Sequence, residues 1–128
     1  MPTKPRIAGF GHVHLPAKNL DRQRTFYTEN FGLNVLVDEV DFLMLGYDGG
    51  NISFGRVPRV PQETVNVHFG FRVDDPAELE RWEVFLKTRG VDLLSGTTDV
   101  TSDHVQGRTL VCRDPEGYAV ELSYEVEE

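Results

Sequence analysis

The stretch Arg113-Asp-Pro-Glu-Gly-Tyr-Ala-Val-Glu-Leu-Ser-Tyr124 contains a turn followed by a strand, and it decides the fold. The turn at residues 114–117 has Asp first, Pro second and Gly fourth, as type I turns favour. The next residues alternate, and one face of the strand is aromatic or aliphatic: Tyr118, Val120 and Leu122. The other face holds Glu121 between two small residues, Ala119 and Ser123. This pattern suits a carboxylate pointing into a cavity; the simpler alternative is a solvent-facing glutamate.

The composition is that of one soluble globular domain covering residues 1–128. Hydrophobic residues make up 39% of the chain and charged residues 27%, and no apolar run is long enough to cross a membrane. The N-terminal residues lack the long apolar segment of a secretory signal. The single cysteine, Cys112, excludes an intrachain disulfide and fits a reducing cytoplasm, where we expect the protein to act.

The charge of the chain restricts its partners. The net charge is −8, and the lysines and arginines form no cluster. A basic patch is what attracts phosphate backbones and anionic lipids, so nucleic acid and membranes are poor partners for this chain.

The first half begins with a predicted strand over Ile7–Leu15 that carries two histidines. His12 and His14 are two residues apart and therefore share a face. Such a pair can serve as metal ligands, as acid or base groups, or simply as polar residues on a hydrated face. A helix follows, with Asn19 as a suitable N-cap and Gly32 as a suitable C-cap.

The remaining strands of the first half are expected at residues 33–37, 42–47 and 51–57, with a hairpin turn at 48–50. A linker with two prolines, at residues 58–61, places a module boundary near Val60.

The second half repeats this order. A strand over 65–73 places His68 and Arg72 on one face, and a helix follows with Asp75 as N-cap and Pro76 as its first residue. After Gly90, strands are expected at 91–94, 108–113 and 118–124, with a polar loop at 95–106.

The two halves match each other in spacing. His12 precedes Gly32 by 20 residues, and His68 precedes Gly90 by 22. An internal repeat of this length predicts an α+β fold of two βαβββ modules, at about residues 7–60 and 65–125. Such modules can pair their curved mixed sheets around a shared cavity, with a histidine on the first strand of each.

Three segments carry a resemblance to a known family: His12-Val-His-Leu-Pro-Ala-Lys-Asn-Leu20, His68-Phe-Gly-Phe-Arg-Val-Asp74 and Asp114-Pro-Glu-Gly-Tyr-Ala-Val-Glu-Leu122. With them, about residues 7–125 resemble the vicinal oxygen chelate superfamily. That superfamily includes glyoxalase I, extradiol dioxygenases, methylmalonyl-CoA epimerase, and the fosfomycin and bleomycin resistance proteins. The resemblance implies three metal ligands, His12, His68 and Glu121, and a homodimer.

Two imidazoles and one carboxylate would leave coordination positions open. Such a set suits divalent Fe, Mn, Zn, Ni or Co, with two oxygens of a chelating substrate completing the coordination. The resemblance therefore implies a metal-dependent lyase or isomerase, or a dioxygenase, acting on a small oxygenated or aromatic substrate. The alternative is a metal-free protein that binds an antibiotic or toxin and so confers resistance.

The chain departs from the subfamilies at several positions. Ser53 stands where glyoxalase I has a fourth, glutamate ligand, and serine is a poor ligand. The hairpin at 48–51 lacks the catalytic histidine of extradiol dioxygenases, although His104 is a candidate for a second one near their last turn. The loop at 96–103 does not resemble the cation-binding loop of fosfomycin thiol transferases.

Further candidate residues complete the predicted site. His14 should line the same cavity as His12, as an acid or base, as a hydrogen-bonding group for the substrate, or as a solvated side chain. Ser53, Arg72 and Arg108 are candidate substrate contacts, the two arginines because a guanidinium suits a carboxylate.

Overall fold

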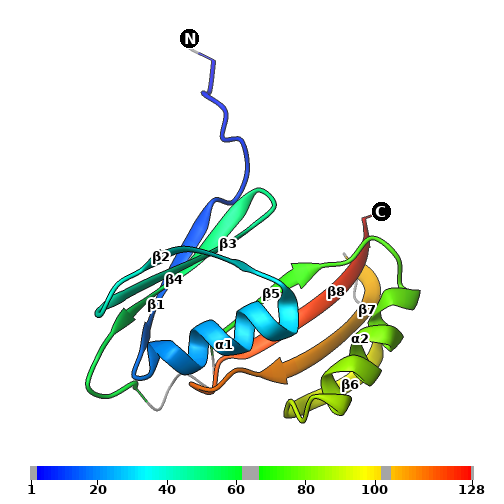
Figure 1. Cartoon of the computed structure of the whole chain (residues 1–128). Helices are drawn as coiled ribbons and strands as arrows, with labels where there is room; N and C mark the ends of the chain where they lie inside the picture. Colours follow the sequence, from blue (N-terminus) through cyan, green and yellow to red (C-terminus); the bar gives the residue numbers. More distant parts are fainter. Residues whose placement is uncertain (1–2, 62–66, 102–104, 128) are drawn as a thin grey trace. The chain divides into compact units, whose positions relative to one another are not determined.

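The chain forms two compact units, Met1–Val57 and Pro58–Glu128, in a computed structural model that describes residues 3–61, 67–101 and 105–127. The first unit contains β1 (His12–Ala17), α1 (Leu20–Phe31), β2 (Asn34–Asp38), β3 (Phe42–Tyr47) and β4 (Gly50–Arg56). The second contains β5 (His68–Arg72), α2 (Ala77–Thr88), β6 (Leu93–Thr101), β7 (Val105–Arg113) and β8 (Ala119–Glu127) (Figure 1). The predicted α+β fold of two βαβββ modules is confirmed.

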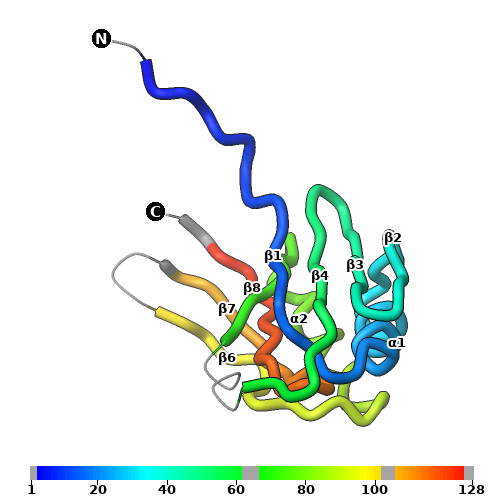
Figure 2. The backbone as a smooth tube through the Cα atoms, turned by 90° about the vertical axis from the view of Figure 1, so that its left-hand side faces the viewer, coloured from blue at the N-terminus to red at the C-terminus, as the bar shows by residue number. Residues whose placement is uncertain are grey.

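Each unit has one four-stranded mixed sheet with the same topology. The strand order is β1-β4-β3-β2 in the first unit and β5-β8-β7-β6 in the second. The histidine-bearing strand lies at an edge and pairs in parallel with the last strand of its unit, as Figure 2 shows for β1 beside β4. The other pairings are antiparallel. Both units thus place their first and last strands side by side.

The core of the first unit lies between its sheet and α1. The sheet residues on this side are at most 3% exposed: Leu43, Leu45, Ile52 and Phe54. Tyr27 of α1 stacks on Phe54 with ring centroids 5.7 Å apart. The predicted caps of α1 are confirmed, because the Asn19 Oδ1 accepts a hydrogen bond from the Arg22 backbone N–H at 3.0 Å and Gly32 adopts a left-handed φ of 70°.

The core of the second unit has the same construction. Leu79 and Leu86 of α2 are fully buried, and the buried residues of the sheet include Leu110, Val120 and Leu122. The predicted Asp75 cap is present, since its Oδ1 accepts a hydrogen bond from the Ala77 backbone N–H at 2.9 Å. The helix begins at Ala77, one residue later than predicted, although Pro76 has helical backbone angles.

Two strand predictions were wrong. The first strand begins at His12 instead of Ile7, and the described residues before it are exposed and carry two glycines, which disfavour a strand. The predicted polar loop at 95–106 contains the ends of two paired strands, since β6 runs to Thr101 and β7 begins at Val105. Threonine is a good strand former, so polarity alone misled the prediction.

Candidate functional site

The sheet of the first unit has a polar face on the side away from α1. His12 and His14 point to this face from β1, where they lie opposite Asn51 and Ser53 of β4 in the strand register. Both histidines are exposed, whereas Ser53 is only 4% exposed. The alternation predicted for the two histidines therefore holds, and they lie side by side on an open face.

His14 is held by three contacts. Its Nδ1 lies 2.7 Å from the Ser53 Oγ, a hydrogen bond whose donor depends on the ring tautomer. The ring stacks on Phe42 of β3, with centroids 5.8 Å apart and planes 18° apart. A Cβ at Gly55 would lie 2.8 Å from the His14 Nε2, so the ring occupies the space that this glycine leaves open. The imidazole is thus fixed in orientation although it is exposed.

Sequence reasoning missed Phe42 and Gly55 in this group. A glycine inside a strand is a signal of close approach by another group, and Gly55 stood in a predicted strand. The sequence could not show that Phe42 lies opposite Gly55, because only the strand register determines this pairing. Asn51 was also missed: among the described residues, nothing hydrogen-bonds its buried Oδ1.

The second unit has the corresponding face on its own sheet. His68, Gly70 and Arg72 point to it from β5. Glu121 of β8 lies opposite Gly70, one strand across and two residues along from His68. Strand geometry puts the Cα atoms of His68 and Glu121 about 8 Å apart, close enough for an imidazole and a carboxylate to converge on one ion.

Gly70 is required for this pairing. A Cβ at this position would lie 2.5 Å from the Glu121 carbonyl oxygen and 3.0 Å from its Cβ. Any larger residue would separate the two strands. Ala119 and Ser123 flank Glu121 on β8, as the sequence predicted, so small residues surround the carboxylate on three sides.

The registers of the two units relate Ser53 to Glu121. In each unit, one residue of the last strand lies opposite the residue two places after the first histidine of the first strand. This position is at the centre of the polar face. That residue is Ser53, opposite His14, in the first unit and Glu121, opposite Gly70, in the second. One unit therefore carries a hydrogen-bonded Ser–His pair at the position where the other carries a glutamate.

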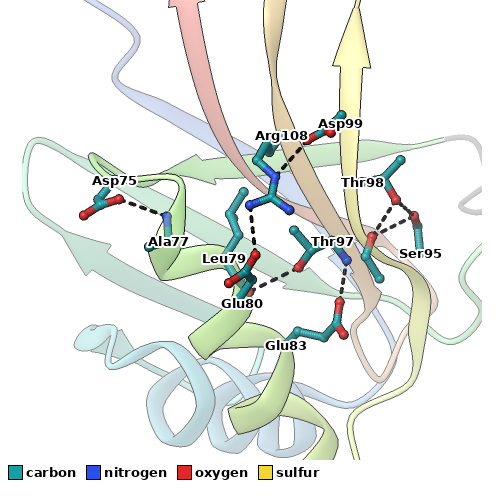
Figure 3. A network of polar contacts seen from close by, with 11 residues as sticks. Asp75, Ala77, Leu79, Glu80, Glu83, Ser95, Thr97, Thr98, Asp99 and Arg108 are labelled. Carbon is teal, nitrogen blue, oxygen red and sulfur yellow. Dashed lines mark hydrogen bonds and ion pairs between the residues drawn. The ribbon is translucent and has the colours of Figure 1, made fainter.

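Arg108 lies on the opposite face of the second sheet. It shares its side of β7 with the buried Leu110, and its guanidinium pairs with Glu80 of α2 at 3.1 Å and with Asp99 of β6 at 2.9 Å (Figure 3). These two carboxylates raise the pKa of Arg108. The structure therefore does not bring Arg108 together with His68 and Glu121.

Two other residues considered from the sequence, His104 and Cys112, contribute nothing to these faces among the described residues. His104 lies outside the described residues. Cys112 is 1% exposed, and burial raises the pKa of its thiol to about 12, so it is a packing residue as predicted and would be a poor nucleophile.

Within each unit, the described residues bring no three His, Cys, Asp or Glu side chains close enough together for a metal ion.

None of the helices in the described part of the chain is long and apolar enough to span a membrane.

Comparison with known proteins establishes the family. The model of the Glyoxalase/Bleomycin resistance protein/Dioxygenase superfamily matches residues 9–122, and the chain belongs to this superfamily. The predicted resemblance is thereby confirmed.

The individual relatives are distant. The chain is 27% identical over 122 residues to a manganese-dependent 2,3-dihydroxybiphenyl 1,2-dioxygenase of Geobacillus genomosp. 3, covering 94% of this chain but only 38% of that protein. It is 22% identical to the metallothiol transferase FosB of Staphylococcus epidermidis, covering 91% of this chain and 83% of that one. The crystal structure of lactoylglutathione lyase from Agrobacterium tumefaciens shares the fold, with a TM-score of 0.77 and 19% identity over 93% of this chain and 95% of that one.

Proposed function

We propose that this protein is a divalent-metal-dependent enzyme whose metal is bound by His12, His68 and Glu121 and whose substrate chelates that metal. The observation that carries the proposal is the pairing of β5 with β8. This pairing places His68 and Glu121 diagonally on one face of the sheet. Gly70, which lies opposite Glu121, has no side chain and so lets the two strands approach closely. The second unit thus supplies two of the three proposed ligands on one rigid sheet.

The donor set and its surroundings fit a divalent ion. Imidazole nitrogens and a carboxylate suit Mn, Fe, Co, Ni or Zn. His12 is exposed and has no hydrogen bond to any described residue, so its ring nitrogens are available to bind. Beside it in the register, the buried Oδ1 of Asn51 lacks a described donor and could accept a hydrogen bond from a ligand or water. The names of the dioxygenase and the metallothiol transferase support a divalent metal in this family.

A bound metal would supply a Lewis acid for two neighbouring oxygens of the substrate. The chain's own residues would orient the substrate. Ser53 and Phe42 hold the His14 ring in place, and we assign His14 as the group that hydrogen-bonds the substrate or exchanges a proton with it. Both a lyase or isomerase and a dioxygenase fit this arrangement, and the substrate is a small oxygenated or aromatic molecule.

Metal analysis tests the proposal. Protein purified without a histidine tag or chelator should contain about one metal ion per chain, and His12→Ala, His68→Ala and Glu121→Ala should each lose it. Glu125→Ala is the matched control, since Glu125 is an exposed carboxylate farther along the same face of β8 and should keep the metal.

Failure to bind metal after anaerobic reconstitution would contradict the proposal. It would favour the alternative, a metal-free protein that binds an antibiotic or toxin, for which the stacked Phe42 and His14 offer a flat contact surface. His14→Ala should abolish turnover and keep the metal, whereas loss of metal would contradict its assigned role.

We also infer that the chain forms a homodimer in the cytoplasm. Its superfamily membership supports this inference, and sedimentation velocity would test the oligomeric state. A monomer at micromolar concentration would contradict it.

A further inference from the structure

Arg72 is an arginine without a described partner on the face that carries His68 and Glu121. It is the last residue of β5, it is exposed, and it lies opposite the small Ser123 of β8. No side chain among the described residues forms a hydrogen bond or an ion pair with its guanidinium. Its position two residues beyond Gly70 keeps it on the same side of the sheet as the two proposed ligands.

Four other described arginines of the second unit are engaged, and a fifth, Arg59, lies outside its strands. Arg81 pairs with Glu78 on α2, Arg108 pairs with Glu80 and Asp99, Arg113 donates to the Gly117 carbonyl, and Arg89 lies over the Phe85 ring. In a chain with a net charge of −8, an arginine left unpaired beside a proposed metal site is a positive group available to a ligand. Glu125 continues the same face of β8, but no ion pair connects it to Arg72.

We propose that Arg72 binds a carboxylate of the substrate while two other oxygens of that substrate chelate the metal. The inference rests on the proposed metal-dependent function and names the class of substrate, a chelating molecule that also carries a carboxylate. The flat guanidinium matches the two oxygens of a carboxylate in a bidentate pair, whereas a phosphate dianion commonly requires more than one cation. A single unpaired arginine on this face of the described sheet therefore favours a carboxylate.

The separation of the groups limits the size of that substrate. Glu121 lies opposite Gly70, and Arg72 is two residues further along β5, so the Cα atoms of Glu121 and Arg72 are about 8 Å apart. A long arginine side chain extends over part of this distance. A chelating group and a carboxylate separated by one aromatic ring, or by a chain of similar length, would fit between the metal and the guanidinium.

Calorimetric titration of the Mn²⁺-loaded full-length protein tests the inference with two matched probes. Catechol and 3,4-dihydroxybenzoate offer the same pair of chelating oxygens, and only the second carries a carboxylate. The wild-type protein should bind 3,4-dihydroxybenzoate about tenfold more tightly than catechol, as one charge-assisted pair allows. Arg72→Gln should remove this preference and leave catechol binding unchanged, and Arg72→Lys should restore only part of it.

Arg81→Gln is the matched control, because it removes the same charge from an exposed position on α2, which packs against the other face of the sheet. It should keep the full preference for the carboxylate. An equal preference in wild type and Arg72→Gln, with Mn²⁺ and catechol still bound, would overturn the inference alone. Absence of Mn²⁺ binding in the wild-type protein would overturn the proposed function and the inference together.

Discussion

At the scale of single residues, His14 shows how one hydroxyl orients an exposed imidazole. A histidine on an open sheet face would normally sample several rotamers. Here the Ser53 Oγ at 2.7 Å fixes the Nδ1 side of the ring, and Phe42 covers one ring face. A group prepared in this way loses less entropy when it binds a substrate. Ser53 is thus expected to act on the proposed site through His14.

The change Ser53→Ala tests this arrangement. Removal of the hydroxyl leaves the His14 Nδ1 without its partner, so we expect the free energy of unfolding to fall by about 1 kcal/mol in urea titrations. The imidazole ¹⁵N chemical shifts of His14 should change more than those of His68, which lies in the other unit. Ser53→Cys preserves the approximate volume and retains a weak donor, so it should have a smaller effect. Unchanged His14 shifts in Ser53→Ala would contradict the orienting role.

At the scale of elements, glycine positions decide which strands can approach closely. Gly70 allows β5 to pair with β8 although a Cβ would contact the Glu121 backbone. Gly11 precedes β1 and has nothing within 4 Å of a Cβ built on it. Glycine is therefore essential at position 70 and replaceable at position 11, because only a side chain at position 70 would clash with a neighbouring strand.

We expect Gly70→Ala to destabilise the protein by about 1–3 kcal/mol, because β5 must move away from β8 to admit the methyl group. It should also weaken binding of Mn²⁺, since the movement separates His68 from Glu121. Gly11→Ala is the control and should change neither quantity. Chemical denaturation and metal titration measure the two effects, and equal stability of the two variants would contradict the packing argument.

Helix α2 holds the irregular strand β6 through one carboxylate. The register of β6 shifts twice, between Leu93 and Ser95 and between Ser95 and Thr98. Glu83 accepts a hydrogen bond from the Thr97 backbone N–H at this irregularity (Figure 3). It also pairs with Lys87 at 3.1 Å. The hydrogen bonds to Thr97, and then Lys87, hold the pKa of Glu83 below its ordinary value of 4.5. The contact stabilises a strand that the sequence alone suggested was a loop.

The lowered pKa predicts a dependence of stability on pH. The unfolded chain binds a proton at Glu83 more readily than the folded chain, so this stabilisation is complete above pH 4.5 and decreases as the pH falls through the lower folded value. Glu83→Gln should reduce the acid dependence of the urea midpoint below pH 4.5 and lower the midpoint at neutral pH. An unchanged acid dependence in Glu83→Gln would show that the contact contributes nothing to stability.

At the scale of the whole molecule, the two units share a topology but differ in chemistry. The polar face of the first unit carries two histidines, Asn51, Ser53 and Phe42. That of the second carries His68, Glu121 and Arg72. Repetition of the βαβββ unit thus supplies the same scaffold twice, and changes at equivalent positions make the two faces chemically different.

A metal that binds only the folded chain should stabilise it. Mn²⁺ at about 100 times its dissociation constant should add about 2.7 kcal/mol, seen as a rise in Tm that EDTA reverses. We expect His12→Ala and Glu121→Gln to abolish the rise, although they lie in different units, and Glu125→Gln to preserve it. A full rise in His12→Ala would exclude the first unit from the metal site.

The sequence by itself determined the features that depend on near neighbours in the chain. Asn19 and Gly32 predicted the ends of α1, and Asp75 predicted the start of α2 to within one residue, because capping is a local interaction. The alternation around Glu121 and the spacing of the histidines predicted faces and a repeat, since side chains alternate along any strand. The loop predicted at 95–106 failed because pairing with β7 and contact with α2 outweighed local polarity.

Only the tertiary structure decided which side chains meet. Ser53 contacts His14 across 39 residues of sequence, and Glu121 lies opposite Gly70 through a parallel pairing that no local pattern specifies. Arg72 and Arg108 looked equivalent in the sequence, yet one lies on the face of Glu121 and the other pairs with carboxylates on the opposite face. The physical reason is that strand register is set by the packing of the whole sheet, and a shift of one residue would exchange its two faces.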